Sequence, residues 1–256
     1  MMPVYALYSK NSRGTLDTDI RTARVNGKII NLDPGKMIAP GDIIRLNGET
    51  FIVKRVTPAD FPYSVKRRAQ IIQFWDSGLI TSYMGIFPGT TVLESGVGTG
   101  SMSFSILSAL GGRGKLLSVD IDQDAVDLAK RNVTSLLGST VCKIWETYVG
   151  DISSIQIPGT FDLCILDVPQ PWSALENVSR HLNPGGMVCF YCPTYNQVEH
   201  TVDDLEKNGF RFLESHEIID RKLMVRSNAT RPDNDLIGHT AFISFAIRTS
   251  GIYVNL

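Results

Sequence analysis

The sequence has no apolar run long enough to cross a membrane. Its longest apolar run near the end, residues 241–247, is far shorter than the ~20 residues that a bilayer-spanning helix requires. No basic segment followed by an apolar one stands at the start of the chain, so we expect no signal peptide. These absences favour a cytoplasmic protein that has no contact with membranes.

Cysteine is also scarce, at four in 256 residues. Cys189 and Cys192 form a C-x-x-C, but they lie inside an apolar run that predicts a strand. Residues three apart in a strand point to opposite faces, which argues against a shared metal ion. We therefore expect no metal site, and buried thiols in a reducing cytosol.

Neither sign of charge is in excess, because the net charge is −1 at pH 7. Residues 1–60 hold nine Lys or Arg against six Asp or Glu, and the remainder holds sixteen against twenty. That difference is small enough to be ordinary surface charge. The cluster Lys66-Arg67-Arg68 either meets phosphates or is a solvated helix start, and the sequence leaves both open.

What is present predicts a small β domain at residues 1–60 and a larger α/β domain at residues 61–256. Asn26-Gly27 and Asn47-Gly48 each stand between apolar-flanked segments, which predicts hairpins because both residue types tolerate a positive φ. We expect a compact sheet or partial barrel, with no element predicted in the polar start of the chain. Binding or packing are the available roles for this part.

A linker is predicted at residues 57–62, which hold two prolines, followed by helices at 64–75 and 77–85. From residue 91 on, strands alternate with helices, which predicts a mostly parallel sheet covered by helices on both faces. In such folds ligands bind at the carboxyl edge of the sheet. The expected strands are 91–95, 115–121, 143–148, 161–166, 186–192, 211–220 and 239–248, and the expected helices are 99–110, 123–137, 171–182 and 194–208.

The central stretch is residues 91–100, a buried strand that ends in Glu94 and leads into three glycines at alternate positions, Gly96, Gly98 and Gly100. Glycine lets the backbone turn tightly and approach a ligand closely. A dinucleotide fingerprint would need a glycine where Ser101 stands. The E-x-G-x-G-x-G form instead resembles the first motif of S-adenosylmethionine (SAM) methyltransferases. The alternative is a tight strand-to-helix turn without a ligand.

Three acids stand at the ends of later predicted strands. Asp120 follows the glycines at a spacing that suits a carboxylate bound to the ribose hydroxyls of an adenosine. A helix cap is the alternative for Asp120, although Asp122 or Asp124 is better placed for that. Asp151 follows the third strand, where it either accepts a hydrogen bond from an adenine amino group or belongs to an ordinary turn.

Asp167 ends the fourth strand and is followed by a loop that two prolines, Pro169 and Pro171, hold rigid. Such a loop can fix an acid beside a reactive methyl group, and it resembles the D/N-P-P-Y loop of methyltransferases that modify amines of bases. The alternative is a proline-rich turn whose carboxylate favours the helix dipole. Gly238-His239-Thr240, before the last strand, is unusual, but a lone histidine is more often structural than catalytic.

Together these residues resemble the tRNA adenine-N1 methyltransferase family of the TrmI type, which acts on position 58 of the T loop. The resemblance implies a Rossmann-like class I methyltransferase fold with a seven-stranded sheet and a small N-terminal β domain, a tRNA substrate and a homotetramer. The matching segments are Ala69-Gln70-Ile71-Ile72, residues 92–100, Ser118-Val119-Asp120, Arg131-Asn132-Val133, Leu166-Asp167 with Pro171-Trp172, Asn196-Gln197-Val198, and Arg231-Pro232 with residues 238–242.

The resemblance also implies roles for single residues. Asp167 would be the catalytic acid that faces the target base and would also contact the cofactor. His239 would contact the substrate. The remaining cofactor-binding residues would be Gln70, Glu94, Gly96, Val97, Gly98, Thr99, Gly100, Ser101, Asp120, Ile121 and Asp151.

This sequence departs from the family at two places. The family often has Glu where Asp120 stands, and Tyr-Pro where Gln73-Phe74 stands. Because that tyrosine is thought to touch the target adenine, stacking on the base would fall here to Phe74, Trp75 or Tyr83.

Two other functions remain open at this level. One is a SAM methyltransferase of small molecules of the corrin-precursor type, which has a related fold. The other is a non-catalytic tRNA-binding subunit, which would be expected to lose its glycines or its active-site acid. Gly96, Gly98, Gly100 and Asp167 all stand in this sequence.

Overall fold

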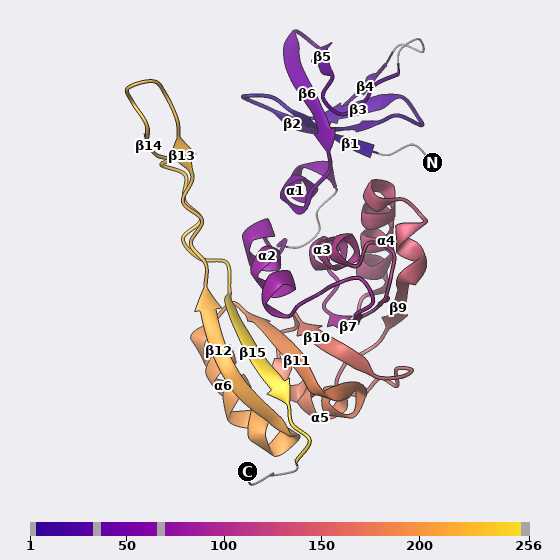
Figure 1. Cartoon of the computed structure of the whole chain (residues 1–256), viewed down its shortest axis with the longest axis vertical. Helices are drawn as coiled ribbons and strands as arrows, with labels where there is room; N and C mark the ends of the chain where they lie inside the picture. The colour runs from indigo at the N-terminus through magenta and orange to yellow at the C-terminus, as the bar shows by residue number, and fades with distance from the viewer. Residues whose placement is uncertain (1–3, 33–36, 66–69, 252–256) are drawn as a thin grey trace.

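The computed structural model describes residues 4–32, 37–65 and 70–251, and these fold into two large sheets joined by a short helical connection (Figure 1). The smaller sheet is antiparallel and comes entirely from the first part of the chain. The larger sheet is mostly parallel and carries helices on both faces. The class of fold that the sequence predicts is therefore confirmed.

The N-terminal sheet has six strands in the order β4-β3-β2-β1-β6-β5. Its two Asn-Gly pairs form the expected turns, because Asn26, Gly27, Asn47 and Gly48 all have positive φ. The polar start of the chain, for which no element is predicted, supplies β1 and β2. The strands are β1 Val4–Tyr8, β2 Arg13–Asp17, β3 Thr22–Val25, β4 Lys28–Asn31, β5 Ile43–Leu46 and β6 Glu49–Arg55.

The connection between the sheets differs from the prediction. A 3-10 turn, η1 Pro58–Asp60, leads into the short helix α1 Phe61–Ser64, and the next helix is α2 Phe74–Tyr83. The predicted helix at 64–75 is wrong over residues 70–73, which hold no helix. Two adjacent isoleucines, Ile71 and Ile72, are both buried there. The basic cluster at 66–68 lies outside the described residues.

The large sheet has the strand order β12-β15-β11-β10-β7-β8-β9. Only β15 runs against its neighbours, β11 and β12. The chain enters at the central strand β7 and builds outward to both sides, so β7 and β10 flank the point where the strand order reverses, which is where ligands bind in such sheets. The strands are β7 Thr91–Ser95, β8 Lys115–Asp120, β9 Trp145–Val149, β10 Phe161–Leu166, β11 Leu182–Cys192, β12 Phe210–Glu217 and β15 Phe242–Arg248.

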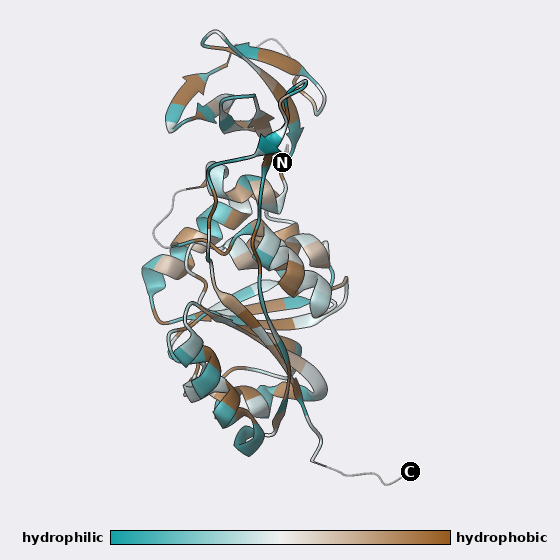
Figure 2. Cartoon of the chain, turned by 90° about the vertical axis from the view of Figure 1, so that its left-hand side faces the viewer, coloured by the Kyte–Doolittle hydropathy of each residue, from teal (hydrophilic) through white to brown (hydrophobic). Residues whose placement is uncertain are grey.

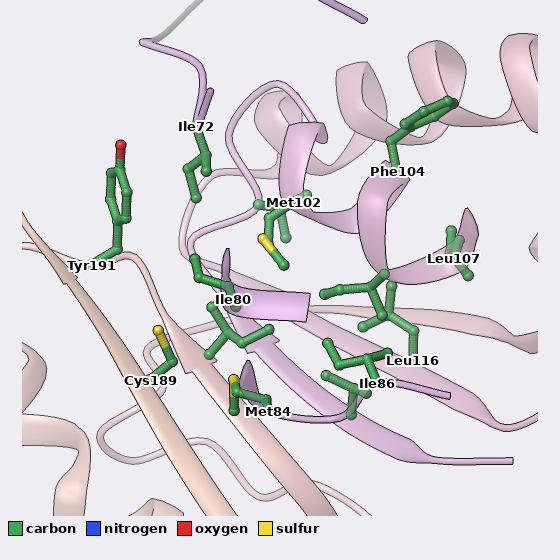
Figure 3. Packing of buried hydrophobic residues seen from close by; sticks show 14 of the residues in the cluster. Ile72, Ile80, Met84, Ile86, Met102, Phe104, Leu107, Leu116, Cys189 and Tyr191 are labelled. Atoms are coloured by element: carbon green, nitrogen blue, oxygen red, sulfur yellow. The ribbon is translucent and has the colours of Figure 1, made fainter. Parts of the chain in front are cut away.

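Two apolar clusters hold helices against opposite faces of this sheet. On one face α2, α3 and α4 pack over Val92, Leu116 and Cys189, and Figure 3 shows Met102, Phe104 and Leu107 of α3 in this cluster. On the other face α5 and α6 pack over Leu93, Leu117 and Phe190. The helices are α3 Ser101–Leu110, α4 Gln123–Leu137, η2 Val141–Ile144, α5 Pro171–His181, α6 Tyr195–Leu205 and η3 Glu206–Asn208.

A long arm, residues 218–241, leaves the body between β12 and β15 and runs toward the level of the N-terminal sheet (Figure 1). Two short strands, β13 Leu223–Met224 and β14 Arg231–Pro232, pair near its tip. Apolar and polar residues are mixed along it (Figure 2). The predicted strands at 211–220 and 239–248 extend into both ends of this arm, and the sequence predicted no strand between them where β13 and β14 lie.

None of the helices in the described parts of the chain combines the length and apolarity that crossing a bilayer would require.

Candidate active site

A cavity of about 680 Å³ opens at the carboxyl edge of the large sheet, which is within the usual size of small-molecule sites. The ends of β7, β8, β10 and β11 and the turns that follow β7 to β11 form most of its wall. The lining residues are Gln70, Ser95, Gly96, Gly98, Asp120, Ile121, Gly150, Asp151, Ile152, Asp167, Val168, Pro169, Gln170, Ser173, Tyr191, Pro193 and Gln197.

The glycine bend after β7 brings the backbone close to Asp167. Gly96 has φ +88°, and a Cβ on it would lie 1.9 Å from the Asp167 carbonyl oxygen. The Asp167 N–H donates to the Ser95 carbonyl at 2.8 Å, which ties the ends of β7 and β10 together. Only glycine permits this approach, since any side chain would push the two strand ends apart.

Asp120 holds the same bend from the neighbouring strand. Its Oδ2 accepts hydrogen bonds from the backbone N–H groups of Val97 at 2.8 Å and Gly98 at 3.1 Å. Its Oδ1 accepts from the Asp122 N–H at 3.0 Å. The cap of α4 is Asp122, whose side chain accepts from Asp124 N–H, so the capping alternative for Asp120 is not needed. Asp120 both shapes the glycine bend and lines the cavity.

Asp167 faces the cavity from the end of β10. Burial, reinforced by the negative charge of Asp120, raises the pKa of Asp167 to about 7. The loop that follows is held from α6, because the Gln197 side-chain amide donates to the Pro169 carbonyl at 2.9 Å. The sequence-based expectation of a rigid loop that presents an acid agrees with this geometry.

Glu94 lies behind the glycine bend and is only 1% exposed, so it does not line the cavity. Its Oε2 accepts from the Ser103 hydroxyl at 2.7 Å and from the Ser118 hydroxyl, and Ser118 in turn accepts from the Trp145 indole N–H. Burial raises the pKa of Glu94 to about 7. In this structure Glu94 supports the loop from within rather than facing a ligand.

The pKa of Glu94 gives a stability prediction. Its carboxyl ionises near 4.5 in the unfolded chain and at about 7 when folded, so folding stability falls as pH rises between these values and then levels off. The expected loss is about 3 kcal/mol, since each pKa unit is worth about 1.4 kcal/mol. Glu94→Gln should reduce the slope of this part of the pH profile and leave the share that Asp167 contributes, measured by urea unfolding at pH 5, 6, 7 and 8.

The matched control is Glu199→Gln, which changes an exposed glutamate on α6 and should keep the wild-type slope. If the Glu94→Gln protein showed the same slope as wild type, Glu94 would already be ionised in the folded protein.

The other cofactor residues implied by the resemblance fall into two groups. Gln70, Ile121 and Asp151 line the cavity, and the Asp151 carboxylate accepts from the Ser153 N–H at 2.8 Å, which lowers the pKa of Asp151. The second group lies under the bend and outside the cavity wall. Its members are Val97, Thr99, Gly100 and Ser101.

Each member of this second group has a structural contact. Gly100 is the N-cap of α3 with φ +91°, and a Cβ there would lie 2.9 Å from Val133 and 3.1 Å from Ala129. The Ser101 hydroxyl donates to the Ile72 carbonyl at 2.7 Å. Thr99 accepts from the Asn132 amide through its carbonyl. These residues fix the loop that the cavity uses.

The residues predicted to touch a substrate base are not among those that line the cavity. Phe74 and Trp75, at the start of α2, meet edge to face at 5.0 Å, and Phe74 is 39% exposed. Tyr83 stacks on Phe245 at 4.0 Å, which covers one face of its ring. Stacking of the substrate base on Phe74, Trp75 or Tyr83 stays a prediction.

His239 braces the rim of the cavity. Its Nε2 lies 2.9 Å from the carbonyl of Pro193, a lining residue, and its Nδ1 lies 2.6 Å from Glu217 Oε1. These two acceptors, the Pro193 carbonyl first, raise the pKa of His239. Both ring nitrogens of His239 are therefore engaged by the protein. This favours a structural role, which the sequence left open as the alternative to substrate contact.

Sequence reasoning missed Tyr191 and the polar side chains Gln170, Ser173 and Gln197, which all line the cavity. Tyr191 lies near the carboxyl end of β11, the strand that follows Asp167 in the chain. Because parallel strands bring their carboxyl ends to one edge of the sheet, Tyr191 could have been predicted in the same way as the acids. Its aromatic character made it look like part of the apolar run.

The donor set suits SAM. Asp120 and Asp151 can accept from hydroxyl and amino groups, Ile121, Ile152 and Val168 offer apolar contacts, and Gly98 leaves open space where a side chain would stand. Two carboxylates in the cavity wall, Asp120 and Asp167, suit a cationic sulfonium. In the described residues no group of three or more His, Cys, Asp or Glu side chains is arranged to hold a metal ion.

Comparison with known families matches residues 50–233 to the family described as tRNA methyltransferase complex GCD14 subunit. A relative from Methanocaldococcus jannaschii, named tRNA (adenine(57)-N(1)/adenine(58)-N(1))-methyltransferase TrmI, is 28% identical over 222 residues, which cover 78% of this chain and 79% of the relative.

Two solved structures resemble the whole chain. An SAM-dependent O-methyltransferase from Thermotoga maritima is 26% identical, with a TM-score of 0.84 over 98% of this chain and 95% of that one. The tRNA (m1A58) methyltransferase TrmI from Aquifex aeolicus is 25% identical, with a TM-score of 0.79 over 96% and 97% of the two chains.

Proposed function

Because the chain belongs to the GCD14 family of tRNA methyltransferase complex subunits, we propose that it transfers a methyl group from SAM to N1 of adenine 58 in the T loop of tRNA. The observation that carries this function is the placement of Asp167 against the glycine bend in one cavity. A carboxylate beside the methyl donor can orient an adenine ring and stabilise the positive charge that the ring gains on methylation.

The cofactor supplies an activated methyl group on a sulfonium, and the protein supplies position and charge. Asp120 is placed to accept from the ribose hydroxyls, and Asp151 from the adenine amino group of the cofactor. The backbone at Gly96 and Gly98 permits close approach to the amino-acid part. Gln70 and Ile121 complete the cofactor contacts that we propose.

Asp167 acts on the target base. Adenine N1 has its own lone pair, so no strong base is needed to activate it. The ring becomes cationic as the methyl group arrives, and an ionised Asp167 accepts a hydrogen bond from the exocyclic amino group and stabilises the developing charge. Alignment of N1, the methyl carbon and the sulfur supplies much of the remaining acceleration.

N1 lies on the Watson–Crick edge of adenine, so the nucleotide must leave its stack before it can react. A single subunit whose net charge is −1 offers few contacts for this work. We propose that the chain acts as a homotetramer in the cytoplasm, in which the N-terminal sheet and neighbouring subunits share the tRNA.

The arm at 218–241 supports the oligomer. Five large apolar side chains on this thin segment are between 48% and 77% exposed: Ile219, Leu223, Val225, Leu236 and Ile237. Several exposed large apolar side chains on one segment favour a protein contact there. The arm has no second layer of its own that could cover them in a monomer.

Replacing Leu223 and Val225 together by serine should therefore dissociate the oligomer by at least one step, because both side chains lose apolar contact area. Sedimentation velocity on the double variant and wild type measures the change. Ser227→Ala, on the same arm, is the control that keeps the wild-type mass. An unchanged mass for the double variant would remove the arm from the subunit contacts.

The non-catalytic alternative receives no support from the cavity, because Gly96, Gly98 and Asp167 all stand in its wall. The small-molecule alternative differs from the proposal in the substrate that accepts the methyl group. Purified protein with labelled SAM should methylate an unmodified tRNA transcript and should fail on a transcript in which position 58 is uridine. Transfer to corrin precursors with none to tRNA would overturn the proposal.

A further inference from the structure

Tyr191 and Asp76 form a buried pair behind the cavity. The Tyr191 hydroxyl donates to Asp76 Oδ2 at 2.9 Å, between residues 115 apart in the chain. Asp76 is fully buried on α2, and Tyr191 is 8% exposed near the end of β11. Neither residue has been given a part in the reaction so far.

The surroundings of Asp76 favour its role as the acceptor in this pair. It lies in the first turn of α2, where the helix dipole favours a negative charge. Burial raises the pKa of Asp76, and hydrogen bonding from Thr240, from Tyr191 and from the Gln73 backbone N–H opposes that shift. Burial, with the nearby charges of Asp76 and Asp167, raises the pKa of Tyr191 and keeps the phenol neutral.

Thr240 adds a second hydroxyl beside the carboxylate. Its Oγ and Asp76 Oδ1 are both buried, and within the described residues neither has a hydrogen-bond partner of normal geometry. Because Thr240 lowers the pKa of Asp76, its hydroxyl lies next to the carboxylate. This gives Thr240, the last residue of the unusual Gly-His-Thr segment, a place in the same polar cluster.

Tyr191 also stands next to the catalytic acid. Strands β10 and β11 pair in parallel with Leu166 opposite Phe190, so Asp167 and Tyr191 occupy the next step at the carboxyl edge. Both line the cavity. Figure 3 shows the Tyr191 ring at the margin of the apolar cluster, with its hydroxyl directed away from Cys189.

The direction of this hydrogen bond matters for an N1 methyltransferase. A phenol that donates toward adenine N1 would occupy the lone pair that must attack the methyl group. A phenol whose proton is held elsewhere presents only acceptor lone pairs to the base. Tyr191 is the tyrosine in the cavity wall, and its proton is directed to Asp76.

We propose that Asp76 is a positioning residue that takes the Tyr191 hydroxyl proton away from the cavity and so keeps N1 of the target adenine free to react. This inference rests on the proposed function of the cavity. Asp76 acts through Tyr191 and does not touch the substrate.

Asp76→Asn tests the proposal because asparagine has nearly the same shape as aspartate but reverses the direction of the hydrogen bond with the Tyr191 hydroxyl. The asparagine oxygen serves the Gln73 N–H, so its NH2 group donates to the Tyr191 oxygen and turns the phenol proton toward the cavity. We expect kcat for tRNA methylation to fall about 10- to 100-fold, the range of one hydrogen bond that must be broken. The KM for tRNA and the SAM affinity, measured by calorimetry, should stay within about 3-fold of wild type.

The decisive comparison places the Asp76 variants in a protein that also carries Tyr191→Phe. Removing the hydroxyl removes the proton that could block N1, so kcat should fall by less than about 5-fold. Adding Asp76→Asn to Tyr191→Phe should cause no further loss, so the double variant should be faster than Asp76→Asn alone. Asp76→Leu, which offers no acceptor at all, should behave as Asp76→Asn does in both backgrounds.

A purely structural role for Asp76 in anchoring α2 predicts a different pattern. The Asp76 variants would then lower kcat as much with phenylalanine at position 191 as with tyrosine, and that result would overturn the proposal. An unchanged kcat for Asp76→Asn in the Tyr191 protein would overturn it as well. Asp162→Asn, which alters a carboxylate that accepts from Thr91 at the opposite edge of the sheet, is the control expected to keep wild-type kcat.

The same experiment separates this inference from the proposed function. If wild-type protein fails to methylate tRNA, the function itself is wrong. If wild type methylates tRNA and the double variant does not recover relative to Asp76→Asn, only the role of Asp76 is wrong.

Discussion

Asp167→Ala should reduce methyl transfer to tRNA about 100- to 1000-fold, the range seen when a group that stabilises transition-state charge is removed. Asp167 faces the cavity beside the glycine bend, and among the described lining residues it is the carboxylate at the end of β10. The affinity for SAM should remain within about 3-fold, because Asp120 and Asp151 keep their places. Single-turnover transfer from labelled SAM and calorimetric SAM titration measure the two effects.

Asp167→Asn refines this result, since the amide keeps the shape but can turn its NH2 group toward the adenine amino group. It should also lose transfer. If Asp167→Ala lost SAM affinity and transfer to the same extent, the assigned part of Asp167 in the methyl-transfer step would be refuted.

Gly96→Ala should abolish measurable SAM binding. The new Cβ would lie 1.9 Å from the Asp167 carbonyl oxygen, on a residue with φ +88°, so the ends of β7 and β10 would have to separate. Overpacking of this kind typically costs about 1–3 kcal/mol of stability, which a folded domain can tolerate while its cavity is distorted. Thermal unfolding and SAM titration of the same sample give both quantities.

Gly112→Ala is the matched control for backbone strain. Gly112 has φ +82°, yet its Cβ would meet nothing within 4 Å, and it lies beyond the end of α3 and outside the cavity wall. It should lose stability by about 1 kcal/mol and keep wild-type SAM affinity. Wild-type SAM affinity in Gly96→Ala would mean that the close contact between β7 and β10 is not needed for the site.

The central elements could be predicted because their sequence periods are strong. Strands β7 and β10 and helix α4 have the predicted bounds, since short apolar runs between turn residues and a long amphipathic stretch leave little choice. The acids at the strand ends followed from the same pattern, because parallel strands bring their carboxyl ends to one edge. Asp120, Asp151 and Asp167 accordingly line one cavity.

Local pattern did not predict the parts that depend on tertiary contacts. Residues 70–73 look helical by composition, but Ile71 and Ile72 are buried against the large domain, and the Ile72 carbonyl accepts from Ser101. The arm carries apolar residues that no core covers, which a sequence pattern cannot distinguish from a strand extension.

The sequence predicted where the site lies, but not the contacts that its buried side chains make. Sequence reasoning could not tell that Glu94 faces two serines rather than a ligand, because both arrangements use a strand-end acid. Tyr83 offered an aromatic ring at a plausible place, but one face of the ring is stacked on Phe245. The hydrogen bond between Tyr191 and Asp76 joins residues 115 apart in the chain, and no local sequence pattern predicts it.

The most direct test of the whole account is the position and atom of the methyl group in an unmodified tRNA transcript treated with purified protein and SAM, read by nuclease mapping and mass spectrometry. The account predicts 1-methyladenosine at position 58, and the same map shows whether adenine 57 is modified as well. An unmodified adenine 58, with the methyl group on a ribose oxygen, on some other base or nowhere in the tRNA, would contradict it.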